Sequence, residues 1–128
     1  MTEVAVTFAR DSGLVRTVRL VAAAVARRAA RDEEFVEEVR LAVGEACGLL
    51  VGASLSDPGA DAGDSVTVRM RLDGTFAVSV TAAESIVVAA SRGEAALDPW
   101  TLLRGLVGDV EVRHRDGVVV VCMRWPAV

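Results

Sequence analysis

Residues Leu41–Ser54 read LAVGEACGLLVGAS and predict an apolar helical segment that carries a single carboxylate, Glu45. A carboxylate among apolar neighbours is costly unless it is paired, solvated or used in function. Glycines recur every fourth residue, at Gly44, Gly48 and Gly52, although each glycine inside a helix costs about 1 kcal/mol relative to alanine. Residues four apart share a helix face, so one face of this helix has almost no side chains. A sheet, a ligand or another chain can therefore approach the helix backbone closely on that face.

The residues before and after this segment predict a strand followed by two helices. Alternating apolar residues over Glu3–Phe8 indicate a half-buried strand. A first helix, capped at its start by Asp11 or Ser12, is expected to run to about Ala30. A second helix is expected to begin after the cap Asp32 and to end near residue 51. The Pro, Gly, Asp and Ser residues at positions 54–64 then predict a loop.

The second half of the chain predicts two hairpins separated by a short helix. A three-residue connection at positions 73–75 sets Leu72 opposite Phe76, both on the core side. The short helix is expected over residues 100–107, and the last hairpin, over 110–125, turns at Asp116-Gly117. This order predicts an α+β fold over a single domain, residues 1–128. Its architecture is a two-layer sandwich in which helices cover one face of a mixed, mostly antiparallel sheet.

Composition excludes several classes of function. The net charge of −4 and the isoelectric point near 5.0 argue against a nucleic-acid-binding protein. No apolar run approaches the ~18–20 residues that a membrane span needs, and no basic leader precedes an apolar stretch, so a cytoplasmic protein is expected. Cys47 and Cys122 lack a CxxC spacing and are expected to be buried free thiols. The chain contains neither Asn nor Gln.

The apolar helical segment resembles the second helix of the histidine-kinase-like ATPase fold. Within that fold it resembles the small anti-sigma-factor serine kinases of Gram-positive bacteria and actinobacteria, whose helix reads roughly L-A-V-x-E-A-C-x-N-A. The residues that match this pattern in place are Leu41, Ala42, Val43, Glu45, Ala46 and Cys47. The closing stretch 98–125 resembles the family's last helix and hairpin, with Asp109-Val110 at the place of a D-x-V motif.

The resemblance implies that Glu45 polarises the attacking hydroxyl and that an Asn four residues later holds Mg²⁺. That second position is Leu49, which offers no oxygen ligand. The adenine-binding Asp of a D-x-G-x-G motif is expected near residues 80–84, where the chain reads VTAAE, and Gly93 stands alone where the family has a Gly-rich lid. Since phosphoryl transfer depends on positioning and on metal-based charge stabilisation, we interpret the chain as a degenerate member.

Accordingly, we assign no metal ligand and expect neither ATP nor Mg²⁺ as a cofactor. The only catalytic candidate is Glu45, as a vestigial base. A remnant nucleotide pocket is expected at Glu45, Gly48, Leu49 and Gly52. Two simpler interpretations stay open beside this one. Glu45 can be a structural carboxylate that pairs with an arginine or reaches solvent, and the glycine stripe can serve close packing of the helix on the sheet.

The leading hypothesis is a regulatory protein that binds and sequesters a sigma factor or related partner without effective ATP hydrolysis, and that a competing antagonist releases. The resemblance also implies a homodimer. One alternative is an active ATP-dependent serine kinase that phosphorylates the antagonist. A second alternative is a small-molecule sensor that uses the remnant pocket.

Two surfaces are candidates for partner binding. Arg16 and Arg19 of the first helix form either a solvated face or a docking surface for an acidic partner. A two-residue turn in the last hairpin puts four residues on one side of it: Arg113, Arg115, Val118 and Val120. If this side faces away from the helices, it forms an apolar patch with an arginine rim, which is typical of a partner site. The alternative is an ordinary outer sheet face.

Overall fold

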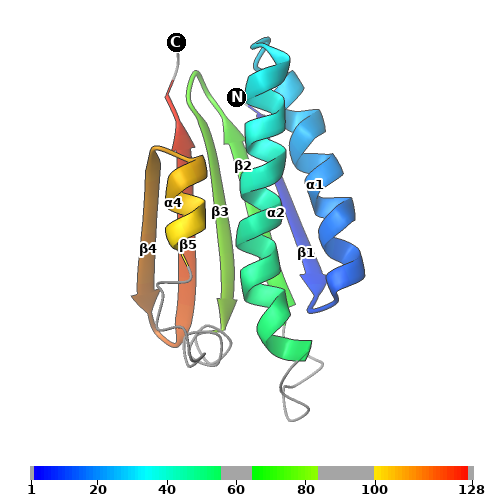
Figure 1. Cartoon of the computed structure of the whole chain (residues 1–128), viewed down its shortest axis with the longest axis vertical. Helices are drawn as coiled ribbons and strands as arrows, with labels where there is room; N and C mark the ends of the chain where they lie inside the picture. Colours follow the sequence, from blue (N-terminus) through cyan, green and yellow to red (C-terminus); the bar gives the residue numbers. More distant parts are fainter. Residues whose placement is uncertain (1, 56–64, 84–99, 127–128) are drawn as a thin grey trace.

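The computed structural model describes residues 2–55, 65–83 and 100–126 (Figure 1). The N-terminal part consists of β1 (Thr2–Ala9), α1 (Ser12–Arg27) and α2 (Glu33–Leu55). The remaining elements are β2 (Ser65–Leu72), β3 (Phe76–Ala83), α4 (Thr101–Leu106), β4 (Asp109–Arg115) and β5 (Val118–Trp125).

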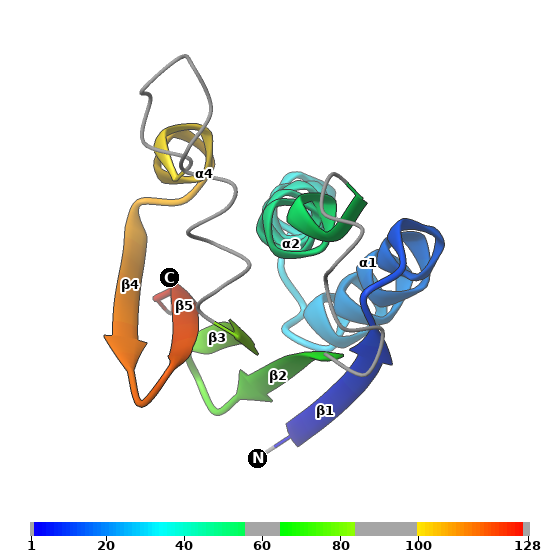
Figure 2. The ribbon, with the colours of Figure 1, turned by 90° about the horizontal axis from the view of Figure 1, so that it is seen from below.

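The five strands form one sheet in the order β1-β2-β3-β5-β4, and all four strand pairs are antiparallel. The three helices of the described residues lie on the same face of this sheet, with α2 between α1 and α4 (Figure 2). Helix α1 lies over the β1 edge, and α4 lies over the opposite edge (Figures 1 and 2). The predicted α+β sandwich with helices on one face is therefore confirmed, and every pairing of the described strands is antiparallel.

Both hairpins have the predicted register. In the first hairpin Leu72 pairs with Phe76, so the connection has three residues. In the last hairpin Arg115 pairs with Val118 around a two-residue turn. Asp116 and Gly117 have φ angles of 53° and 79°, and positive φ at both central residues is what a type I′ turn requires.

The helix starts also agree with the sequence. The Asp11 carboxylate accepts a hydrogen bond from the Gly13 N–H at 2.8 Å, and the Asp32 carboxylate accepts one from the Phe35 N–H at 2.9 Å. Each cap satisfies a backbone donor that the first helical turn leaves free. Asp32 was predicted as a cap, and Asp11 is the N-cap of α1 among the two predicted candidates, Asp11 and Ser12.

The helix ends differ from the prediction. Helix α1 ends at Arg27 rather than near Ala30, because Ala30 adopts the left-handed conformation (φ 55°) that reverses the chain toward α2. Helix α2 continues to Leu55, beyond the predicted end near Val51. Val51 is 1% exposed, so the helix is still packed on the core at its predicted end, although the Gly and Ser content beyond this residue favours a loop. The predicted loop beyond it, residues 56–64, lies outside the described residues.

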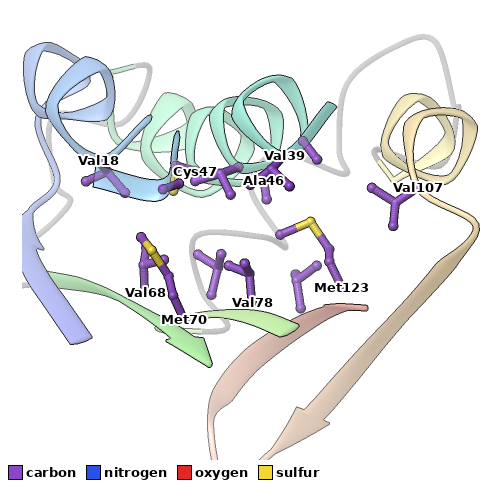
Figure 3. Packing of buried hydrophobic residues seen from close by; sticks show 14 of the residues in the cluster. Val18, Val39, Ala46, Cys47, Val68, Met70, Val78, Val107 and Met123 are labelled. Atoms are coloured by element: carbon purple, nitrogen blue, oxygen red, sulfur yellow. The ribbon is translucent and has the colours of Figure 1, made fainter. Parts of the chain in front are cut away.

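The hydrophobic core lies between the helices and the sheet (Figure 3). Val18 of α1 and Val39, Ala46 and Cys47 of α2 face Val68, Met70, Val78 and Met123 of the sheet (Figure 3). Every buried side chain in the described part of the chain is hydrophobic. Burying one Val or Leu side chain stabilises the fold by roughly 1.5–3 kcal/mol, so this layer supplies most of the driving force for folding.

An aromatic cluster joins α2 to the sheet at one end of the core. The rings of Phe35, Phe76 and Trp125 lie 5.7–6.3 Å apart. The indole N–H of Trp125 donates to the Glu38 carboxylate at 2.9 Å, and the Arg31 guanidinium lies 4.1 Å from the centre of the Phe35 ring. Arg31, which was predicted to lie off the core face, therefore covers this cluster.

Candidate functional site

Glu45 lies on the outer side of α2 and is half-buried. It lines a surface cavity of about 230 Å³ between α1 and α2, together with Arg19, Arg40, Leu41 and Gly44. Glu45 therefore lines a surface cavity together with two arginines, which agrees with its interpretation as a structural carboxylate that pairs with an arginine or reaches solvent. Its interpretation as a vestigial base stays a prediction.

Leu49 lies one turn further along α2, where the family pattern has its metal-binding Asn. Its side chain is half-buried and packs against the hydrophobic core. The neighbouring Leu50 is fully buried. The helix therefore uses position 49 for packing.

Gly44 and Gly48 of α2 do not face the sheet. A Cβ at Gly44 would lie 2.7 Å from the Cδ of Arg19, so the bare backbone at this position accommodates an arginine of α1. Gly48 is exposed, and a Cβ there would meet nothing within 4 Å. The interpretation of the stripe as close helix-to-sheet packing is therefore wrong for these two residues, because Ala42 and Ala46 occupy the buried face of α2 instead. The surroundings of Gly52 lie outside the described residues.

The end of β3 is aliphatic where the family's adenine-binding acid is expected. Val80 and Ala82 are buried in the core and pair with Val121 and Val119 of β5. Both positions therefore belong to the packed layer. Glu84 and Gly93, the other positions considered at sequence level, lie outside the described residues.

The patch predicted on the last hairpin lies on the open face of the sheet. Arg113 pairs with Val120 in the β4–β5 ladder, and Arg115 pairs with Val118, so all four side chains are on one side. This side is opposite to the buried Val119 and Val121. The geometry of the patch is confirmed, and its role in partner binding stays a prediction.

Arg113, one of the two arginines at the rim of this patch, forms an ion pair with Glu111. The Arg113 Nε and Nη2 atoms donate to the two Glu111 carboxylate oxygens at 2.7 and 3.0 Å. These hydrogen bonds lower the pKa of Glu111 below its ordinary value. An ion pair at such an exposed place contributes little to stability.

The two predicted partner surfaces do not come together. Arg16 and Arg19 belong to α1 in the helical layer, whereas the hairpin patch is on the opposite face of the sheet (Figure 2). Arg16 is exposed, but Arg19 is half-buried against Gly44. Arg19 therefore has a packing role that its predicted position off the core face did not suggest.

A second feature of the open face was missed at sequence level. Arg69 and Arg71 of β2 and Arg124 of β5 line a shallow hollow of about 220 Å³ whose floor includes Ser79 and Cys122. The alternation V-R-M-R-L over 68–72 is the signal that could have placed both β2 arginines on the outer face. Cys122 was predicted to be buried and is half-buried on this face instead.

Cys47 is buried, as predicted. Burial raises the pKa of its thiol from 9.0 to about 12, because the apolar surroundings disfavour the thiolate. The thiol is therefore an inert part of the core at neutral pH.

Comparison with known proteins agrees with this arrangement of elements. Residues 8–96 match the family model described as the histidine kinase-like ATPase domain. The chain belongs to this family. Among the described residues of this histidine-kinase-like ATPase domain, no helix is both long enough and apolar enough to cross a membrane.

Thirteen chains of solved structures match the fold. One is the crystal structure of the RsbU and RsbW domains of Rv1364c from Mycobacterium tuberculosis, at 18% sequence identity and a TM-score of 0.68. The match covers 98% of the present chain but only 32% of that one, so the present chain spans about a third of the matched structure and the likeness concerns the fold. None of the curated proteins compared with this chain matches it.

Proposed function

We propose that this histidine-kinase-like ATPase domain is a regulatory binding protein of the anti-sigma type. It holds a sigma factor or a related transcription protein, and a competing antagonist protein releases that partner. The protein holds its partner without effective ATP hydrolysis. It acts in the cytoplasm as a homodimer. The observation that carries the proposal is the packing of Leu49 against the core, at the position where the family pattern places the metal-binding amide.

A magnesium-bridged triphosphate needs oxygen ligands that the described residues do not supply at this place. Mg²⁺ demands near-ideal octahedral coordination by oxygen atoms, and an aliphatic side chain offers none. Glu45 remains as one carboxylate at the mouth of the surface cavity. The donor set at positions 45 and 49 therefore does not fit the ion.

The nucleoside end of the site is equally apolar in the described part of β3. Val80 and Ala82 are buried, so neither offers the carboxylate that would accept a hydrogen bond from an adenine amino group. Positions 49, 80 and 82 of the described residues therefore supply neither a metal ligand nor this acceptor, and phosphoryl transfer depends on charge stabilisation and positioning. This supports binding without catalysis.

The patch on the β4–β5 hairpin has a composition that suits protein recognition. The hairpin patch combines Val118 and Val120, which are half-buried, with Arg113 and Arg115 at its rim. Partly exposed apolar residues bordered by arginine are compatible with a protein interface. We infer that sequestration works by simple occlusion, in which the bound partner can no longer contact polymerase or promoter.

The proposal is tested with the full chain and purified sigma factors of its source organism in a stoichiometric binding and transcription assay. We expect one sigma factor to bind and its transcription to fall in proportion to added protein, equally with and without ATP. Transfer of the γ-phosphate from ATP to an antagonist protein would instead support the serine-kinase alternative and overturn the proposal. Failure of every sigma factor to bind would also contradict it.

A further inference from the structure

The hollow on the open face of the sheet forms because small residues of β3 lie between arginines of its two neighbours. Arg71 of β2 pairs with Ala77 of β3, and Ala77 pairs with Arg124 of β5. Two residues along β3, Ser79 pairs with Arg69. Neighbouring strands lie about 4.8 Å apart, so the backbones of Arg71 and Arg124 are about 10 Å from each other. Long arginine side chains therefore border a floor of small ones, and the space between them measures about 220 Å³.

The two β2 arginines of the hollow differ in their acidic neighbours. The Arg69 side chain is exposed, and within the described residues it makes no hydrogen bond or ion pair. The Nε atom of Arg71 lies 3.3 Å from the Oδ2 atom of Asp73. Glu3 is opposite Arg71 in the β1–β2 ladder and also lines the hollow. Arg69 is therefore available to an external anion, whereas Glu3 repels one.

The acidic neighbours of Arg124 belong to β4, whereas the hollow is on its β3 side. The Nη1 atom of Arg124 lies 3.7 Å from Oδ1 of Asp109 and 3.8 Å from Oε2 of Glu111. Both distances exceed that of a hydrogen bond, so Arg124 keeps donors for another acceptor. The hollow is thus lined by three arginines and one carboxylate, that of Glu3, in a chain whose net charge is −4.

The size and the donors of the hollow define the ligand that fits it. Pockets for drug-sized ligands measure about 300–1,000 Å³, so a hollow of about 220 Å³ takes a more compact molecule than a nucleotide. Guanidinium groups held close together repel one another, and a bound anion relieves this repulsion. A phosphate group carries three strong acceptor oxygens, which suits donors that approach from two sides and from a hydroxyl on the floor.

We propose that this hollow binds the phosphate group of a small phosphorylated metabolite. Arg69 and Arg124 donate to the phosphate oxygens from opposite sides, the Ser79 hydroxyl donates from the floor, and Arg71 adds positive charge. The site is on the face of the sheet opposite to α2 (Figure 2). It is therefore separate from the nucleotide position of the fold, and it stands or fails independently of the proposed function.

Cys122 provides a native reporter of this site. It pairs with Ser79 in the β3–β5 ladder, lines the hollow and is half-buried. The chain has two cysteines, and the other one, Cys47, is buried with a pKa of about 12, so its thiol does not react near neutral pH. A phosphate group held above Ser79 covers the Cys122 thiol, so binding should slow the alkylation of Cys122.

The experiment follows the alkylation of Cys122 by iodoacetamide, a neutral reagent, in the full chain near pH 8 and at constant ionic strength. Peptide mass mapping assigns the modified cysteine. Glycerol 3-phosphate is expected to protect Cys122, with half-maximal protection below about 1 mM. Malonate, a compact dicarboxylate, should protect less, because each of its carboxylates has only two acceptor oxygens.

Substitutions in the lining should change this protection in opposite directions. Arg69→Gln should raise the half-maximal concentration about 10-fold, since it removes a charge-assisted hydrogen bond. Glu3→Gln should lower it, because it removes the carboxylate that repels the ligand. The matched control is Arg27→Gln on α1, since the Arg27 side chain is 56% exposed against 57% for Arg71 and also lies beside one carboxylate. This control should leave the protection unchanged.

Four results would overturn the proposal. Cys122 that does not react in the ligand-free chain would mean that the hollow is closed to solutes. Absence of protection at about 10 mM glycerol 3-phosphate would mean that no phosphate site exists. Equal protection by malonate or by sodium chloride of the same ionic strength would mean unspecific screening. Unchanged protection in both Arg69→Gln and Arg124→Gln, with folding verified by circular dichroism, would place the ligand elsewhere.

Discussion

At the scale of single residues, the two described glycines of α2 have different reasons to be glycine. Gly48 has open space where a Cβ would go, whereas Gly44 faces the Arg19 side chain. Gly48→Ala should therefore raise the free energy of unfolding by about 0.5–1 kcal/mol, the gain in helix propensity. Gly44→Ala should gain clearly less, because Arg19 must move. Chemical denaturation of both variants checks this contrast, and equal gains would show that Arg19 is not held against the helix.

The Glu45 carboxylate is expected to be dispensable for stability and for partner binding. It is half-buried at a surface cavity rather than in the core, so Glu45→Ala should change the free energy of unfolding by about 1 kcal/mol or less. Binding of the partner should persist. Loss of binding by a variant of unchanged stability, measured by calorimetry and denaturation, would assign Glu45 a direct functional role.

The buried thiol predicts a stability change at high pH. Burial raises the pKa of Cys47 from 9.0 to about 12, so below pH 9 the thiol is protonated in both the folded and unfolded chains. Between pH 9 and 12 the unfolded chain loses this proton and the folded chain keeps it. The free energy of unfolding should then fall by about 1.4 kcal/mol per pH unit.

Few other side chains titrate between pH 9 and 12, because the chain has no Tyr and all 14 of its basic residues other than His114 are Arg. A stability change in this pH range can therefore be assigned to a cysteine. Urea denaturation between pH 8 and 12 should show the slope in the wild type and in Cys122→Ala. It should be absent in Cys47→Ala. A slope that persists in Cys47→Ala would mean that another group titrates.

At the scale of elements, the hydrogen bond between Trp125 and Glu38 connects β5 to α2. Trp125→Phe keeps an aromatic ring beside Phe35 and Phe76 but removes the indole donor. Since hydrogen bonds to charged groups contribute about 1.5–3 kcal/mol, less where water reaches them, a loss of about 1–2 kcal/mol is expected. Thermal denaturation measures it, and Glu38→Ala in the Trp125→Phe background should then cost little more if the two groups act as a pair.

Strands and helix starts were predictable because their signals are local. Asp11 and Asp32 cap helices through contacts within three residues, and the hairpin registers follow from alternation and turn length. Helix ends were not predictable in the same way. Helix α2 continues past the buried Val51 to Leu55, although the Gly and Ser content there favours a loop.

At the scale of the whole molecule, the layer order could be predicted but contacts between elements could not. The sequence placed Arg19 on an exposed helix face, since nothing local shows that the bare backbone of α2 lies opposite. The hollow between Arg69, Arg71 and Arg124 likewise requires β2 and β5 to flank β3. For the candidate site, the absence of an amide at position 49 was visible in the sequence, whereas the packing of Leu49 on the core required the fold.

The central claim is that this member of the histidine-kinase-like ATPase family functions without binding a magnesium-bound triphosphate. The most direct measurement is isothermal titration calorimetry of the full chain with ATP, in the presence and absence of Mg²⁺. The account predicts no saturable binding up to about 1 mM ATP and no effect of Mg²⁺, since a Kd above 1 mM corresponds to less than about 4 kcal/mol of binding free energy. A micromolar Kd that depends on Mg²⁺ would contradict it.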